Sequence, residues 1–244
     1  MILAITSRCT MGCSHCLNDC LPEGVDMSQE KFNQFLKMIK ETGTMAPILV
    51  SGGEPTLHPN WFEMVKTLLD NGFYTMLLSN GLFVDNDEQV EKLKILKSYK
   101  FFKEQITHDA QYYPIPINYK KIKELNLILE KQIRAVSSEG RAKKNGIQST
   151  KTYSACINPR SFKIQRPEIK FWGLVGLMTQ AERFCFPLIT PTGDIKSGES
   201  FFCKTIGNIY DSEEKLTDGL SNLSCNTCGL INNPITVLKT MNKL

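Results

Sequence analysis

The sequence lacks the features of several protein classes. It has no apolar run long enough to span a bilayer, and no export signal precedes its first apolar segment, so we expect a cytoplasmic protein without a membrane partner. Its formal net charge is only +4, and aromatic residues do not alternate with its basic ones, so we expect no specific nucleic-acid contact. Many basic residues lie between Lys131 and Lys170, which is either a solvated face or a surface for an acidic peptide or phosphorylated substrate.

Cysteine, in contrast, is abundant, with nine residues among 244. Without an export signal, this number indicates metal binding rather than disulfides. Cys9, Cys13 and Cys16 form a C-x-x-x-C-x-x-C pattern. Thiolates this close can bind one face of a 4Fe–4S cluster, which normally takes four cysteines, so one iron keeps an open position for chemistry. The alternative is zinc, with His15 or Cys20 as the fourth ligand.

A second motif follows about forty residues later. The apolar segment Pro47–Ser51 reads as a buried parallel strand and runs directly into Gly52-Gly53-Glu54-Pro55. Glycines allow the backbone to approach a ligand closely. Their carbonyls, together with the Glu54 carboxylate, can accept hydrogen bonds from an ammonium group.

These two motifs, one β/α unit apart, resemble those of the radical S-adenosylmethionine (radical SAM) superfamily. The resemblance implies that Cys9, Cys13 and Cys16 bind a 4Fe–4S cluster whose open iron chelates the amino and carboxylate groups of S-adenosylmethionine. Reductive cleavage of the sulfonium then gives a 5′-deoxyadenosyl radical. The resemblance also implies that His15 packs near the adenine, and that Ser51 and Pro55 join Gly52, Gly53 and Glu54 in the cofactor site.

Short apolar strands alternate with helical patterns through the first two-thirds of the chain, which predicts parallel β/α units. The fold class is therefore α/β, and the resemblance implies a partial (β/α)6 TIM-like barrel over residues 1–180. The expected strands are Ile2–Thr6, Pro47–Ser51, Phe73–Ser79, Phe102–Thr107, Ile133–Ser137 and Phe171–Leu177. The expected helices start after Ser28 and end at Gly43, or cover Trp61–Asn71, Asp85–Ser98 and Tyr119–Lys131.

Working residues of a barrel lie at the carboxyl ends of its strands. Polar residues there are candidates for the ribose and the methionine carboxylate: Ser79, Asn80, Thr107, Ser137 and Arg141, of which Arg141 is the expected partner of the carboxylate. His108, Asp109, Tyr112 and Tyr113 follow the fourth strand. They either bind substrate or supply a base, or they form a loop anchored by tyrosine packing.

Four further cysteines, Cys185, Cys203, Cys225 and Cys228, are the number that a fully ligated second cluster needs. The glycine-turn hairpin between the first two, and the closing C-x-x-C, resemble the twitch domain, a short relative of the SPASM domain. We therefore expect a small α+β cysteine-rich domain over residues 181–244, with a 4Fe–4S cluster as electron acceptor or relay. Structural zinc is the alternative. Cys20 and Cys156 are left over and are expected to be packed or surface thiols, with a role in substrate handling as the other interpretation for Cys20.

The expected function is that of an oxidoreductase or maturase that cleaves S-adenosylmethionine and abstracts hydrogen from a peptide or a small polar molecule. Such an enzyme needs a reductase, for example flavodoxin or ferredoxin. The alternative is a binding protein stabilised by zinc or iron–sulfur clusters that performs no radical chemistry. That alternative leaves Gly52-Gly53-Glu54-Pro55 without a task.

Overall fold

The computed structural model describes residues 1–41, 43, 47–131, 140–147, 187–198 and 200–221. Its first half comprises β1 (Ile2–Thr6), α1 (Gln29–Glu41), β2 (Ile48–Gly52), α2 (Trp61–Asp70), β3 (Thr75–Ser79), α3 (Asp87–Lys97) and β4 (Phe102–Thr107). Short 3-10 helices η1 (Pro55–Leu57) and η2 (Leu82–Asp85) follow β2 and β3. The remaining elements are α4 (Tyr119–Glu124), β5 (Leu129–Glu130), α5 (Gly140–Lys144), β6 (Leu188–Ile189), β7 (Asp194–Lys196), β8 (Thr205–Asn208) and α8 (Glu213–Ser221).

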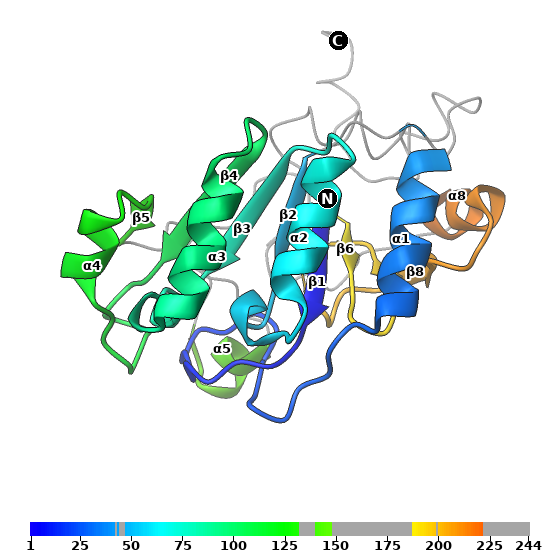
Figure 1. The fold of residues 1–244 in the computed structure, drawn as a ribbon. Helices are drawn as coiled ribbons and strands as arrows, with labels where there is room; N and C mark the ends of the chain where they lie inside the picture. The colour runs from blue at the N-terminus through cyan, green and yellow to red at the C-terminus, as the bar shows by residue number, and fades with distance from the viewer. Residues whose placement is uncertain (42, 44–46, 132–139, 148–186, 199, 222–244) are drawn as a thin grey trace, which may run out of the picture.

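One sheet joins all the described strands, in the order β5-β4-β3-β2-β1-β6-β7-β8. The pairs from β5 through β1 to β6 are parallel, whereas β6–β7 and β7–β8 are antiparallel. Figure 1 shows α1, α2 and α3 over one face of this sheet. The architecture is thus an α/β fold with a mainly parallel sheet, consistent with a partial TIM-like barrel.

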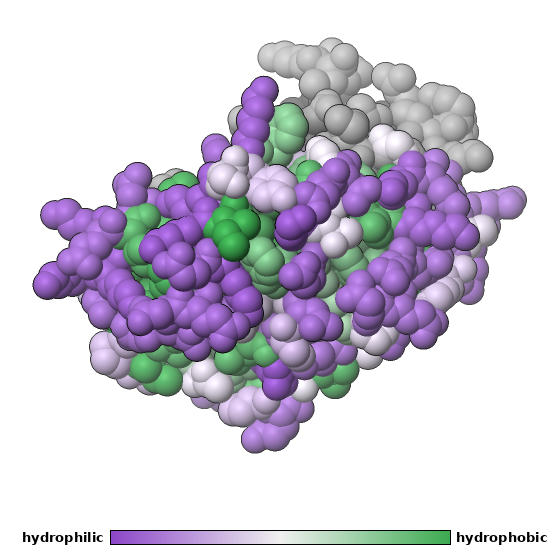
Figure 2. Space-filling view, viewed as in Figure 1, coloured by the Kyte–Doolittle hydropathy of each residue, from purple (hydrophilic) through white to green (hydrophobic). Residues whose placement is uncertain are grey.

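Apolar side chains between the helices and the sheet form the core. Leu3, Ala4 and Ile5 of β1 are all fully buried, so both faces of this central parallel strand are covered, as expected. Phe32 and Trp61 are the largest fully buried side chains of α1 and α2. The outer faces of the helices are largely hydrophilic, as Figure 2 shows. No helix in the described ranges is long and apolar enough to cross a membrane.

The structure confirms the first four predicted strands and the first three helices, with small differences at their ends. Ser28 caps α1 as predicted, because its Oγ accepts a hydrogen bond from the Lys31 amide (3.3 Å). Gly43, at φ +63°, lies just beyond the end of the helix. The glycine-turn hairpin is also confirmed, as β6 and β7, but β6 pairs with β1 and so extends the main sheet.

The predicted helix Tyr119–Lys131 begins at the predicted residue but is too long. The helix ends at Glu124, and Asn126 adopts a left-handed φ of +50°, which a helix cannot accommodate. Leu129 and Glu130 then form β5 and pair with Ile106 and Thr107 of β4. The predicted strands 133–137 and 171–177, and the boundary between residues 180 and 181, lie outside the described residues.

Candidate functional site

The carboxyl ends of β1, β2 and β3 bring both sequence motifs together. The cysteine loop, defined here as Cys9–Cys20, follows β1, and Gly53-Glu54 follows β2. Gly53 N donates to Thr6 O (2.7 Å) and Glu54 N donates to Arg8 O (2.7 Å). The entry to the cysteine loop therefore lies directly against the second motif.

The Glu54 carboxylate forms the centre of a buried hydrogen-bond group, called here the carboxylate hub. Its Oε1 accepts from the Thr56 hydroxyl (2.8 Å), the Thr56 amide (3.2 Å) and the Ser79 hydroxyl (2.9 Å), and its Oε2 accepts from Asn80 N (2.8 Å). Burial raises the pKa of Glu54, and the hydrogen bonds from Asn80, Thr56 and Ser79 oppose that shift. The hub thus fixes the ends of β2 and β3 relative to each other.

Asn80 extends the hub to the cysteines. Its side-chain amide Nδ2 lies 3.8 Å from the Cys9 sulfur, and its Oδ1 accepts from the Leu82 amide (3.0 Å). One residue therefore contacts a sulfur of the first motif through its side chain and the glutamate of the second motif through its backbone. Sequence reasoning placed Asn80 at the site, and the structure brings it to Cys9.

The two glycines are needed for close packing against the strand that leads to the cysteines. A Cβ on Gly52 would lie 2.3 Å from Thr6 O, and one on Gly53 would lie 2.1 Å from Arg8 O. Real Cβ atoms do not approach a backbone atom so closely, and Gly52 also has a φ of +114°. The expectation was that these glycines admit a ligand; the described contacts show that they admit the chain's own backbone.

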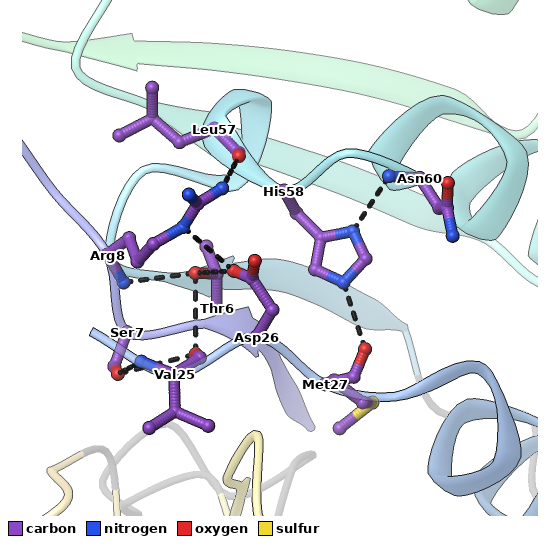
Figure 3. Close-up of polar contacts among 9 residues, drawn as sticks. All are labelled: Thr6, Ser7, Arg8, Val25, Asp26, Met27, Leu57, His58 and Asn60. Carbon is purple, nitrogen blue, oxygen red and sulfur yellow. Dashed lines mark hydrogen bonds and ion pairs between the residues drawn. The ribbon is translucent and has the colours of Figure 1, made fainter. Parts of the chain in front are cut away.

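A polar clamp, drawn in Figure 3, joins the start of the cysteine loop to η1. Arg8 donates through Nε to Asp26 (3.1 Å) and through Nη2 to Leu57 O. Asp26 also accepts from the hydroxyl of the fully buried Thr6 (2.6 Å). Nearby, the buried His58 accepts from the Asn60 amide at Nδ1 and donates from Nε2 to Met27 O (2.9 Å). Sequence reasoning missed this clamp, because none of its residues belongs to a motif.

The three cysteines of the first motif are half-buried thiols outside any disulfide. Burial raises the pKa of Cys9, and it raises the pKa of Cys13 to about 12. A hydrogen bond from the Cys20 thiol lowers the pKa of Cys16 to about 6 and raises that of Cys20 itself. Cys20 is buried, and its Sγ also donates to Gly52 O (3.6 Å). The Cys20 side chain therefore contacts both sequence motifs.

Helix α5 lies under the cysteine loop (Figure 1). Arg141 donates to the carbonyls of Cys13 (3.1 Å) and Cys20 (2.6 Å) and forms an ion pair with Asp19 (3.0 Å). Its backbone amide donates to Cys16 O (2.9 Å). These bonds engage three of the five N–H donors of the guanidinium, and the expected pairing of Arg141 with the carboxylate of S-adenosylmethionine stays a prediction.

The predicted polar–aromatic cluster packs beside the cysteine loop. His15 lies 4.9 Å from the Tyr112 ring and 5.3 Å from the Tyr113 ring, centre to centre. Burial lowers the pKa of His15 to about 4, and its Nδ1 is buried with no hydrogen-bond partner among the described residues. A buried unpaired nitrogen of this kind indicates a partner that this part of the chain does not supply, consistent with a bound cofactor.

Two members of this cluster are already engaged. His108 is buried, with Nε2 bonded to Ile115 O (2.9 Å) and Nδ1 to the Tyr119 hydroxyl (2.8 Å). The Asp109 carboxylate accepts from the Gln111 amide (3.0 Å) and so stabilises the turn. The contacts support the anchored-loop alternative for both residues, and their role toward substrate stays a prediction.

The thiol donors of Cys9, Cys13 and Cys16 suit both a 4Fe–4S cluster and zinc. Zinc would take its thiolates around one centre, whereas each thiolate on a cluster binds a different iron. Within the described residues, no three histidine, cysteine, aspartate or glutamate side chains are placed to hold one metal ion. The choice between the two metals therefore depends on the comparisons with known proteins.

Other predicted residues are placed as follows. Ser51 lies in β2, Pro55 is buried at the start of η1, and Thr107 ends β4 opposite Glu130. Cys203 follows a loop that touches the cysteine loop, since Phe201 N donates to Asn18 Oδ1 (2.9 Å). Ser137, Cys156, Cys185, Cys225 and Cys228 lie outside the described residues.

Comparison with solved structures supports the fold. BtrN in complex with AdoMet and 2-DOIA superposes with a TM-score of 0.60 at 15% identity, covering 91% of this chain and 82% of that one. Streptococcus suis SuiB bound to precursor peptide SuiA superposes with a TM-score of 0.57 at 12% identity, covering 94% of this chain and 69% of that one. Identities this low show a shared fold only.

Sequence comparison places the similarity in the first part of the chain. A PqqA peptide cyclase of Bradyrhizobium diazoefficiens is 29% identical over 93 residues, which are 37% of this chain and 24% of that protein. The matches to curated relatives span only 20–36% of their lengths. The model of the radical SAM superfamily matches residues 3–137, the segment that carries both motifs, the carboxylate hub and the clamp. The chain therefore belongs to the radical SAM superfamily, whose members are enzymes that use an iron–sulfur cluster and S-adenosylmethionine.

Proposed function

We propose that Cys9, Cys13 and Cys16 hold the 4Fe–4S cluster of this enzyme, and that the ends of β2 and β3 bind S-adenosylmethionine beside it. When bound, the cluster supplies the electron that cleaves S-adenosylmethionine to methionine and a 5′-deoxyadenosyl radical, which abstracts hydrogen from a substrate carbon. The observation that carries this proposal is the position of Asn80, which contacts the Cys9 sulfur and the Glu54 carboxylate at once.

The protein's own residues have distinct tasks in this proposal. Glu54 already accepts four hydrogen bonds, so it chiefly orients Ser79 and Asn80 toward the cofactor. An ammonium group of the cofactor would add one more bond to this carboxylate. His15 is neutral near pH 7 and presents a flat ring for the adenine, with an unpaired Nδ1 available to it.

We also assign the substrate and the second cluster as proposals. The substrate is a peptide or a small polar molecule. The similarity to a PqqA peptide cyclase and to SuiB bound to precursor peptide SuiA supports a peptide. The similarity to BtrN in complex with 2-DOIA supports the small molecule instead. Cys185, Cys203, Cys225 and Cys228 would bind an auxiliary 4Fe–4S cluster that takes or relays an electron. The reductant would be a small electron carrier such as flavodoxin or ferredoxin.

The test is anaerobic reconstitution followed by an iron count and a 5′-deoxyadenosine assay with dithionite as the reductant. The wild-type protein should release 5′-deoxyadenosine, and Cys13→Ala should fall to the background rate because one of the three cluster ligands is gone. Wild-type protein with its full iron and no release would contradict the proposal and favour the metal-stabilised binding protein. Deuterium transfer from labelled peptides or small alcohols into 5′-deoxyadenosine would then identify the substrate class.

A further inference from the structure

Arg141 donates three side-chain hydrogen bonds to the cysteine loop. Its Nη1 and Nη2 donate to the carbonyls of Cys13 and Cys20, and its Nε donates to Asp19. Three separate points of the loop are thus held by one planar side chain, a geometry that the guanidinium group suits and an ammonium group does not.

The backbone around Arg141 shows that α5 and the loop are packed as one unit. Arg141 N donates to Cys16 O, and Asn145 Nδ2 donates to Ser14 O (2.8 Å). A Cβ on Gly140 would lie 2.4 Å from Leu17 O, so the helix start touches the loop without space for a side chain. The guanidinium is therefore fixed in position relative to the thiols.

The charge of Arg141 is shielded from water. Only 15% of its side chain is exposed, as is 14% of that of Asp19, whereas Lys144, the second partner of Asp19, is 69% exposed. Charges in a poorly solvated site interact more strongly than charges on the surface. Arg141 and Asp19 are thus a half-buried pair of opposite charges beside the three cysteines.

We propose that Arg141 is a positioning residue that both holds the cysteine loop and raises the reduction potential of the cluster. This inference rests on the proposed function. Gain of one electron makes a thiolate-bound cluster more negative, and a fixed positive charge nearby stabilises that reduced form. Net charge, hydrogen bonds and solvent exposure are the factors by which proteins tune such potentials. Asp19 has the opposite effect on the reduction potential, because its negative charge disfavours the reduced form of the cluster.

The test is an anaerobic redox titration of the first cluster, followed by electron paramagnetic resonance without S-adenosylmethionine. Arg141→Gln should move the midpoint potential to a more negative value, with an equilibrium constant for one-electron reduction about tenfold lower, or about 59 mV. Asp19→Asn should move it to a more positive value. Asparagine also tolerates the left-handed φ of +50° at this position, so the backbone should be kept.

Two further variants separate charge from geometry. Arg141→Lys keeps the positive charge but loses the planar guanidinium that bonds three points of the loop. The reduction potential of the cluster should therefore stay close to that of the wild type. A chelator should remove iron from this variant faster than from the wild type. Lys144→Gln removes an exposed charge that touches Asp19 but no loop carbonyl, and its shift should be clearly smaller than that of Arg141→Gln.

The measured potentials and the iron content decide between the possible roles of Arg141. Unchanged potentials in Arg141→Gln and Asp19→Asn, or shifts of the same sign, overturn the proposal. If Arg141→Gln fails to hold iron, the holding role is supported and Asp19→Asn alone decides the electrostatic one. If the wild type shows no iron–sulfur signal, the proposed function fails instead, and the two failures are thereby distinguished.

Discussion

The carboxylate hub and the cysteine loop lie side by side, but they are held in different ways. In the hub, one carboxylate accepts all the bonds, from two hydroxyls and two backbone amides, and Glu54, Ser79 and Asn80 are all buried. The cysteine loop is held mainly at its backbone: carbonyls of Cys13, Cys16 and Cys20 accept from Arg141, while the thiols remain outside any disulfide. The hub therefore depends on a single side chain, whereas the contacts of the loop leave its thiols available for the proposed cluster.

This contrast predicts its largest effect at Glu54. In the apo protein, Glu54→Ala should lower the free energy of unfolding by about 3 to 5 kcal/mol, because buried donors of Thr56, Ser79 and Asn80 lose their acceptor. Cys13→Ala in the same apo protein should cost about 1 kcal/mol or less, since only a half-buried thiol is lost. Denaturant unfolding of both variants measures the difference, and equal losses would refute the contrast.

The contrast also explains what the sequence could reveal. The spacing of Cys9, Cys13 and Cys16 and the Gly52-Gly53-Glu54-Pro55 segment identified the family, because side-chain chemistry at fixed spacing is visible in a sequence. The buried parallel strands were also predictable, since their apolar runs need cover on both faces. The turn at Asn126 was not, because the helical pattern continues through it and tertiary contacts decide where the helix stops.

Contacts to the backbone were the least predictable. The sequence suggests Arg141 as the partner of a cofactor carboxylate, but its acceptors here include the carbonyls of Cys13 and Cys20. A carbonyl is the same in every residue and leaves no trace in the sequence. The clamp is hidden for a different reason: Arg8 and Asp26 lie 18 positions apart, outside any motif, and only the fold brings them together (Figure 3).

The clamp connects the two regions, and its loss should have an intermediate effect. Asp26→Ala should lower the free energy of unfolding by about 1 to 2 kcal/mol, because the Arg8 guanidinium and the buried Thr6 hydroxyl lose an acceptor. Asp87→Ala is the matched control, since it removes an exposed partner of Lys121 in the first turn of α3 and should cost only about 0.5 kcal/mol. Thermal unfolding would measure both. If the control were destabilised as much as Asp26→Ala, the clamp would have no special role.

The smallest effect is expected for a single backbone contact of the cysteine loop. Asn145→Ala removes the hydrogen bond to Ser14 O from an exposed side chain, so the global free energy of unfolding should fall by only about 0.5 kcal/mol. Local opening should change more than global stability, because the lost bond holds only the part of the loop around Ser14. Hydrogen exchange at the amides of residues 14–16 should therefore accelerate several-fold in the apo protein, while exchange in β2 and β3 stays as in the wild type. Exchange that accelerates equally in β2 and β3 would mean that the loop and the carboxylate hub open together, and that the hub does not form a separately stabilised region.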